Sequence, residues 1–401
     1  MESMFYWMLL TVVGLTGFIW SLHLLQLVTR GRDMEFRITA NDDPDAPTDG
    51  ALVSIIIPAR NEEGNIGQCL ATVRDQTYKN IEVIVLNDRS DDGTQAEIEA
   101  AAQKDSRVRG VMGRPRPDGW MGKVWACHVA QQQANGEVLL FIDADVRLTP
   151  EAVRQSLAYL NRTDLEALSI FGRLTMVSFW EWTVQPIIGG LIVQNNDPRD
   201  VNDPDKPDKV IANGQFIMAR RGTYDAFGGH ESIKGEILDD VSFARRCKEN
   251  GHRYHVVYGR QLFDCRMYHS LSEIWEGWTK NLFAGLDYKL AFTLLICQAL
   301  FILNIVPYLT LLGSIVAVAM GALTITDPLL WVSALNVALT YIVYIGGMKI
   351  ADQPIHHFWT FPLGMLVTIG LFANSALKIA TGQGVSWKGR TYVKTSTRQH
   401  D

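Results

Sequence analysis

The chain has 401 residues, which at about 150 residues per domain predicts two or three domains. It is 47% hydrophobic and 20% charged, a balance that excludes a disordered tail protein, a collagen-like fibre and a small disulfide scaffold. The formal net charge of −6 argues against a nucleic-acid-binding protein, because such proteins are usually basic.

Charge is distributed unevenly along the chain. Residues 50–285 are rich in charged side chains, whereas residues 290–325, 329–347 and 357–377 have almost none. Runs of about 20 apolar residues are long enough to cross a bilayer as helices. The sequence therefore predicts a soluble domain inserted into a membrane protein.

The N-terminal apolar run at residues 4–28 is long enough to span the hydrocarbon core. No cation precedes it and no small-residue cleavage site ends it, which argues against a signal peptide. We expect residues 1–30 to form an uncleaved transmembrane anchor. Arg30, Arg32 and Arg37 follow directly, so the positive-inside rule predicts that the soluble domain lies in the cytoplasm, and we expect a multi-pass protein of the cell (inner) membrane.

A polar, acidic segment at residues 31–50 contains proline and glycine and is typical of a linker. The soluble domain is expected at residues 51–265. Its apolar, β-branched runs at 53–57, 81–86 and 137–142 read as buried strands, with helical patterns between them. This alternation predicts an α/β fold, a mostly parallel sheet with helices on both faces.

Polar, acidic residues follow each predicted strand, beginning at Arg60, Asn87 and Asp143. Ligands bind beyond the carboxyl ends of the strands in such sheets, so we expect one carboxylate-rich pocket there. The D-x-D pair Asp143 and Asp145 suits a divalent cation such as Mg²⁺ or Mn²⁺, which also binds phosphate oxygens. The chain has neither a P-loop nor a G-x-G-x-x-G motif, which argues against a P-loop NTPase and a dinucleotide dehydrogenase.

The segment at residues 174–194 has a single charge, Glu181, and has the length of a membrane span. A crossing there would place the acidic motifs on opposite sides of the bilayer. Pro186 and Gly189-Gly190 are also expected to interrupt a helix. We therefore expect an amphipathic element lying in the membrane interface.

The C-terminal region 289–380 is expected to hold three or four transmembrane helices. Pro307 favours a break within the long apolar stretch 290–325. The tail at 381–401 is basic and is predicted to be cytoplasmic, which requires an even number of crossings after the soluble domain. Four crossings satisfy that condition and three do not.

An interfacial amphipathic segment is expected at residues 266–288, just before these helices. Trp275, Trp278 and Phe283 follow helical spacing, which is typical of a helix anchored by aromatic side chains.

Four motifs in this order resemble family-2 glycosyltransferases of the GT-A fold. They are SIIIPARNEE, VLNDRSDDGT, FIDADVRLTP and the long segment from GQFIMARR to RRCKENG. The resemblance covers roughly residues 52–285. The motif GWMGK and the segment RMYHSLSEIWEGWTKN resemble the hopene-associated and carotenoid branch, which includes chlorobactene and diaponeurosporenoate glycosyltransferases.

The resemblance implies roles for particular residues. The nucleoside, most often uridine, would be held by Pro58, Asn61, Glu62 and Asp88. Asp145 would bind the metal, Asp143 would contact ribose or metal, and Lys123 would supply a cation near the nucleotide; its alternative is a solvated helix residue.

The resemblance also implies that Asp239 and Asp240 form the catalytic pair, with Asp240 as the base. Inverting sugar transfer needs such a carboxylate to take the acceptor proton. Two adjacent carboxylates have separated pKa values, which helps one act near neutral pH. The alternative is that they favour a helix N-terminus, and both interpretations are compatible.

The processive motif Q-x-x-R-W is absent, which argues against a polysaccharide synthase. Trp278 and Lys280 remain candidates for sugar stacking and diphosphate binding, besides the anchor interpretation, with Arg266 upstream. His230 is a candidate for the acceptor side.

The function predicted from the sequence is inverting, non-processive transfer of a sugar from a nucleotide-sugar, expected to be a UDP-hexose, to a membrane lipid. Hopanoids, carotenoids and other glycolipid precursors fit as acceptors, and Mg²⁺ or Mn²⁺ as cofactor. The partners are then the donor, the lipid acceptor and the bilayer, with no nucleic acid. Two alternatives stay open, a membrane polysaccharide synthase and a non-catalytic lipid-binding scaffold.

Overall fold

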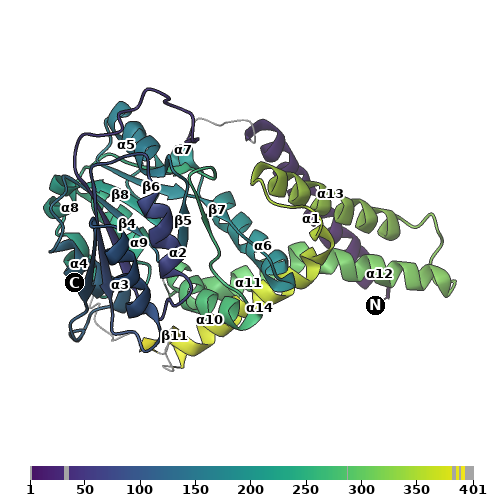
Figure 1. Cartoon of the computed structure of the whole chain (residues 1–401). Coiled ribbons are helices and arrows are strands. Elements are labelled where there is room, and N and C mark those ends of the chain that lie inside the picture. Colours follow the sequence, from purple (N-terminus) through teal and green to yellow (C-terminus); the bar gives the residue numbers. More distant parts are fainter. Residues whose placement is uncertain (1, 31–35, 287, 382–384, 388–389, 393–401) are drawn as a thin grey trace. The chain divides into compact units, whose positions relative to one another are not determined.

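The computed structural model describes residues 2–30, 36–286, 288–381, 385–387 and 390–392 (Figure 1). The chain divides into two compact units. A helical unit contains residues 1–34, 177–194 and 268–401, and a sheet unit contains residues 35–176 and 195–267. The sheet unit is therefore interrupted in sequence by a segment that belongs to the helical unit.

The sheet unit is built on a seven-stranded sheet of order β3-β2-β1-β4-β8-β6-β9. The first four strands in this order are parallel, β8 is antiparallel to β4 and β6, and β6 and β9 are parallel. This is the predicted mixed, mostly parallel sheet. Its strands are β1 (Val53–Ala59), β2 (Ile81–Asn87), β3 (Val108–Met112), β4 (Val138–Ile142), β6 (Ala167–Phe171), β8 (Phe216–Arg220) and β9 (Tyr254–Tyr258).

Helices cover both faces of the sheet, as predicted. Alternate side chains of a strand point to opposite faces. On one face Ile55 and Ile57 join the buried cluster that contains Ile98 of α3. On the other face Phe141 packs against Phe243 of α9, with ring centroids 6.1 Å apart. The helices of this unit are α2 (Ile66–Arg74), α3 (Thr94–Lys104), α4 (Gly122–Gln131), α5 (Ala152–Arg162), α7 (Pro198–Val201), α8 (Arg221–Ala226), η1 (Gly229–Ile233) and α9 (Asp239–Glu249).

The chain runs outward from β1 through β2 to β3 and then returns past β1 to β4. The strand order thus reverses between β1 and β4, and ligands of open α/β sheets bind at such a point, beyond the carboxyl ends of the strands. A three-stranded sheet of β5 (Val146–Leu148), β10 (Phe263–Cys265) and β7 (Arg173–Leu174) continues directly from the end of β4.

Part of the segment expected to be a linker, around Phe36 and Ile38, packs on the sheet unit. Ile38 is 1% exposed, and its N–H donates to the Tyr258 carbonyl at 2.8 Å. The Tyr258 N–H in turn donates to the Phe36 carbonyl at 3.0 Å. The segment therefore pairs with the edge strand β9. Residues 31–35 lie outside the described residues.

The predicted interruption of a helix in segment 174–194 is wrong. Helix α6 (Phe179–Asn195) runs through Pro186 and begins at a capping box in which the Glu181 carboxylate accepts from the Ser178 N–H at 2.5 Å. Glu181, Thr183 and Gln185 are buried, whereas Phe179 is exposed. The buried side chains of α6 thus include polar ones beside the apolar Val184, Ile187 and Ile188.

Four stretches of the described residues are long and apolar enough to cross a membrane: Met4–Thr29, Leu290–Ala319, Pro328–Ile350 and Phe358–Lys378. Only three lie in region 289–380, because α11 (Leu290–Asn304) and α12 (Val306–Ala319) together form one candidate span. The even number of crossings that placed the tail 381–401 in the cytoplasm is therefore not supported. Most of that tail lies outside the described residues.

Within the helical unit, α1 (Glu2–Arg30) lies beside α13 (Pro328–Ile350) (Figure 1). The buried Asn336 amide donates to Thr16 Oγ1 at 2.6 Å, and Tyr6 donates to Asp327 Oδ1 at 2.8 Å. Polar pairs of this kind fix the register of apolar helices. The remaining elements of the unit are α10 (Leu271–Leu282), η2 (Ala284–Leu286), η3 (Phe358–Thr360), α14 (Phe361–Ala380), β11 (Val385–Trp387) and β12 (Arg390–Tyr392).

Candidate active site

The loops that follow β1 and β2 are joined by hydrogen bonds. The Asn61 N–H donates to Ser90 Oγ at 3.0 Å, and Asn61 Oδ1 accepts from the Asp91 N–H at 3.0 Å. The Glu62 N–H donates to Thr94 Oγ1 at 2.8 Å. Asn61 has a φ of 52°, a left-handed conformation that asparagine tolerates. The predicted residues Asn61 and Glu62 therefore shape the rim of the site through these bonds.

Asp88 lies at the end of β2, next to β1. Its side chain is 4% exposed, and its N–H donates to the Ala59 carbonyl at 2.8 Å. Pro58 is paired with Leu86 inside the parallel ladder. Arg60, which the sequence argument did not single out, donates through Nη1 to the Asp88 carbonyl at 2.7 Å. The location of Arg60 within the motif SIIIPARNEE was the sequence feature that could have identified it as a site residue.

Lys123 connects the two acidic motifs. It lies in the first turn of α4, with Nζ 2.7 Å from Asp143 Oδ1 and 3.7 Å from Asp239 Oδ2. Burial opposes its charge, but Asp143 and Asp239 outweigh that effect and hold the pKa of its ammonium well above the usual value. Lys123 therefore lies among the acidic residues, with 36% of its side chain exposed to solvent.

Asp239 and Asp240 form the first turn of α9, so the helix start orients both carboxylates. Asp240 Oδ2 accepts from the Gly214 N–H at 3.0 Å, and Oδ1 accepts from the Val241 N–H at 2.8 Å. Burial and the neighbouring Asp239 raise the pKa of Asp240 to about 6. Such a group is ionised at neutral pH and still basic enough to accept a proton.

Gly214, also missed from the sequence, lies between these groups. Its N–H binds Asp240, and its carbonyl accepts from Lys123 Nζ at 3.4 Å. A Cβ atom at this position would lie 3.1 Å from Lys123 Nζ and 3.3 Å from the Asp240 Cβ. The backbone can approach both side chains this closely because residue 214 has no side chain.

The described residues contain no cluster of three or more His, Cys, Asp or Glu side chains arranged to hold a metal ion. Asp143 and Asp145 supply two carboxylates on the turn between β4 and β5. Mg²⁺ is commonly bound by one or two carboxylates together with substrate phosphates. The two carboxylates of Asp143 and Asp145 therefore fit a divalent cation that is bound together with a diphosphate.

His230 does not lie where an acceptor-side residue was expected. It is 4% exposed, its Nδ1 lies 2.8 Å from the Tyr224 hydroxyl, and its ring packs on Phe141. Burial lowers the pKa of His230 to about 3, which makes it a neutral core residue. The expected acceptor role is not supported.

Trp278 and Lys280 belong to α10 of the helical unit, and Arg266 follows β10 in the sheet unit. Trp278 is 9% exposed, and its Nε1 donates to Gln185 Oε1 at 2.7 Å. The indole thus packs against α6. Neither sugar stacking nor anchoring in the interface is supported for this side chain.

Comparison with known proteins agrees with this geometry. Residues 54–226 match the family model described as Glycosyl transferase family 2. The chain is 27% identical over 239 residues to a 4,4'-diaponeurosporenoate glycosyltransferase of Staphylococcus haemolyticus (strain JCSC1435). It is 29% identical over 245 residues to the protein of that name from Staphylococcus aureus (strain MRSA252). Each match covers 58% of this chain and 61% of the relative, so the chain spans less than two thirds of these relatives.

A solved structure shares the fold. It is the mannosyltransferase PcManGT from Pyrobaculum calidifontis, in complex with GDP-Man and Mn²⁺. The TM-score is 0.52 at 17% identity, and the match covers 91% of this chain and 98% of the other.

Proposed function

We propose that the chain is a membrane glycosyltransferase, because residues 54–226 match the family model described as Glycosyl transferase family 2. It transfers a sugar from a nucleotide-sugar to a lipid acceptor. The observation that carries the proposal is the position of Lys123, whose ammonium joins Asp143 of the D-x-D turn to Asp239 of the α9 pair. This contact supports a single site that contains the D-x-D turn and the start of α9, where Asp240, the candidate base, follows Asp239.

The donor is proposed to bind beyond the ends of β1, β2 and β4. Pro58, Asn61, Glu62 and Asp88 line the nucleoside side of this site. Asp145 and Asp143 would hold the divalent cation, which would neutralise charge on the diphosphate. The expected donor is a UDP-hexose. The mannosyltransferase of similar fold holds GDP-Man and Mn²⁺, so the test includes both nucleotides.

Asp240 is proposed as the general base of an inverting transfer. The acceptor oxygen attacks the anomeric carbon, the bond from that carbon to the diphosphate oxygen breaks, and Asp240 takes the acceptor proton. The Gly214 and Val241 N–H groups hold the two carboxylate oxygens in place. Lys123 balances the negative charges of Asp143 and Asp239. Its positive charge reduces the electrostatic repulsion between these two carboxylates.

The acceptor is proposed to be a carotenoid, hopanoid or similar lipid with a polar end, glycosylated once. Two observations support this. The relatives are named for a carotenoid acid, and four stretches of the chain are apolar enough to cross a bilayer. We place the sheet unit on the cytoplasmic side of the cell membrane, because cations follow α1 directly.

The experiment is sugar transfer in membranes that contain the protein and a carotenoid acid. Radiolabelled UDP-glucose or GDP-mannose is supplied, and label in the chloroform extract is counted with Mn²⁺ and with EDTA. We expect cation-dependent label with one donor, and its loss in the Asp145→Asn variant. Label in an insoluble polymer, or no label with either donor despite folded protein, would contradict the proposal.

A further inference from the structure

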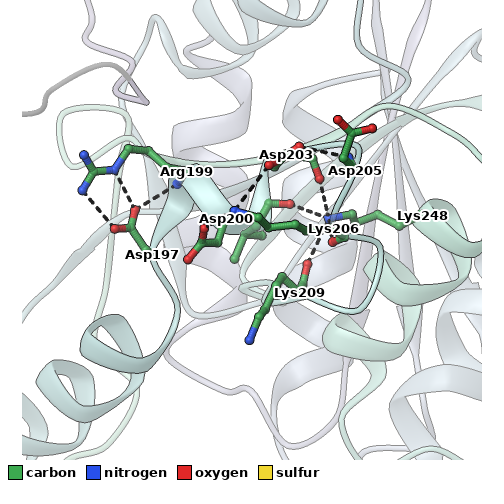
Figure 2. Close-up of polar contacts among 9 residues, drawn as sticks. Asp197, Arg199, Asp200, Asp203, Asp205, Lys206, Lys209 and Lys248 are labelled. Atoms are coloured by element: carbon green, nitrogen blue, oxygen red, sulfur yellow. Dashed lines mark hydrogen bonds and ion pairs between the residues drawn. The ribbon is translucent and has the colours of Figure 1, made fainter.

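A lysine outside the catalytic cluster occupies an unusual position. Lys248, near the C-terminal end of α9, is 8% exposed, and its ammonium points into the loop of residues 197–209 (Figure 2). Nζ donates to four backbone carbonyls of this loop: Val201 at 2.6 Å, Lys206 at 2.8 Å, Lys209 at 3.0 Å and Asp203 at 3.4 Å. An ammonium has three N–H donors, so the loop carbonyls saturate it.

The loop belongs to a longer segment, residues 197–214, which we call the strap. The strap touches α9 at two places. Lys248 binds its first part, and Asp240 accepts from the Gly214 N–H at its end at 3.0 Å. At 1.5 Å per residue these two contacts lie about 12 Å apart along the helix. The strap therefore holds α9 near both of its ends.

The strap itself is fixed to the sheet. Asn202 Nδ2 donates to the Val256 carbonyl at 2.9 Å, and Asn202 Oδ1 accepts from the Val256 N–H at 2.7 Å. The Asn213 N–H donates to Ser169 Oγ at 2.8 Å. The strap is thus tied to β9 and β6, and Lys248 joins the C-terminal part of α9 to the strap, in addition to the packing of the buried Cys247.

We propose that Lys248 is a positioning residue for Asp240: its bonds to the strap fix the axis of α9 and so keep the Asp240 carboxylate against the Gly214 N–H. This inference rests on the proposed role of Asp240 as the base. It assigns a task in the transfer reaction to a lysine that contacts none of the proposed substrate-binding residues.

Loss of the Lys248 donors releases the C-terminal end of α9 and loosens the bond between Gly214 and Asp240. That bond favours the ionised carboxylate, so its loss raises the pKa of Asp240. The charged and titratable groups facing Asp240 are Asp239 on its own helix, Lys123 on α4 and Tyr254 on β9. None of them is altered by a substitution at Lys248.

The test compares Lys248→Met with Lys206→Gln in the full-length protein. Methionine matches the length of lysine without donating hydrogen bonds. Lys206 is the matched control, because its side chain makes exposed ion pairs with Asp200 at 2.6 Å and Asp203 at 3.4 Å, while its carbonyl still binds Lys248 (Figure 2).

For Lys248→Met we expect kcat to fall about tenfold to a hundredfold at pH 7. KM for the donor should stay within about threefold, and the acidic limb of the kcat profile should move to higher pH. The Lys206→Gln variant should match wild type in all three. A kcat near wild type, or a lower kcat with an unmoved pH profile, would overturn the positioning role.

A second measurement follows the strap itself. Trypsin cleavage after Arg199 and Lys209 should be at least about tenfold faster in Lys248→Met than in wild type, and unchanged in Lys206→Gln. If Lys248→Met does not accumulate as folded protein, Lys248→Gln replaces it, since its shorter side chain has two N–H donors instead of three and cannot satisfy the same carbonyls. Unchanged cleavage and wild-type kinetics in that variant would also overturn the inference.

Failure of the inference is separable from failure of the proposed function. If Asp240→Asn keeps transferring sugar, the proposed base is wrong and the role of Lys248 falls with it. If Asp240→Asn is inactive and Lys248→Met behaves as wild type, only the inference about Lys248 is wrong.

Discussion

Lys123 and Asp143 form an ion pair of 2.7 Å between the start of α4 and the turn after β4. The same ammonium lies 3.7 Å from Asp239 on α9. Three elements that are distant in sequence thus meet at one positive charge. Without it, the negative charges of Asp143 and Asp239 would lack their shared counter-ion.

Replacing Lys123 tests this relationship. We expect Lys123→Met to lower kcat/KM about a hundredfold, since the variant loses the fixed positive charge that pairs with Asp143 and Asp239. Initial rates of transfer in detergent or nanodiscs measure the effect. Lys104→Met, at the exposed end of α3, is the control. Equal rates in the two variants would show that Lys123 plays no part.

The pH dependence of transfer should report Asp240. Its pKa is raised to about 6, chiefly by burial, and a general base acts only when deprotonated. We therefore expect kcat to rise with pH through about 6 and to level off above 7. A rate that is flat from pH 5 to pH 8, with substrate saturating throughout, contradicts the assignment.

The same shift predicts an effect on stability. The pKa of Asp240 is higher in the folded protein, so its contribution to stability is fully present below about pH 4 and is lost as the pH rises through about 6. Asp240→Asn cannot lose a proton. The difference in free energy of unfolding between this variant and wild type should shift in favour of the variant by about 1–3 kcal/mol between pH 4 and pH 7.5, as measured by unfolding in detergent. Asp225→Asn, at an exposed position on α8, should show no such trend.

Gly214 offers a steric test of the same site. Gly214→Ala places a methyl group 3.1 Å from Lys123 Nζ, closer than most carbon contacts, so the lysine must shift by a few tenths of an ångström. We expect transfer to fall about tenfold while the protein stays folded. Gly222→Ala is the control, because a Cβ there meets nothing within 4 Å. An active Gly214→Ala enzyme would show that the spacing is not critical.

Trp278 is predicted to act in folding rather than in sugar binding. Trp278→Phe leaves the buried Gln185 Oε1 without its 2.7 Å donor, which should cost about 1–3 kcal/mol of stability. Donor KM should be unchanged. Thermal unfolding and donor titration separate the two effects, with the 56%-exposed Trp359→Phe as the reference variant. A large rise in donor KM with normal stability would restore the stacking interpretation.

The strands and the acidic motifs were predictable because their signals are local. The runs at 53–57, 81–86 and 137–142 became β1, β2 and β4, and the D-x-D and Asp239-Asp240 residues lie at the ends of a strand and a helix as expected. A buried parallel strand is indicated by a run of about five or six consecutive apolar residues. A carboxylate directly after that run can be identified without knowing its distant contacts.

The errors arose where the outcome depends on tertiary partners. Pro186 was expected to break a helix, but α6 continues through it inside the helical unit. His230 looked like a polar residue near the base and is instead buried against Phe141 and Tyr224. Lys248 carried no signal at all, because the carbonyls that surround its ammonium come from a loop about 40 residues earlier in the chain. Sequence spacing does not reveal which side chains such segments bring together.

The most direct test of the account is mass spectrometry of total lipids from cells that make both carotenoids and hopanoids. Cells expressing wild-type protein are compared with cells expressing Asp240→Asn at the same membrane level. We expect a lipid heavier by one hexose in the wild-type cells and its absence in the variant. The same glycolipid in both strains, or no new lipid beside a new polymer in the wild-type cells, would contradict it.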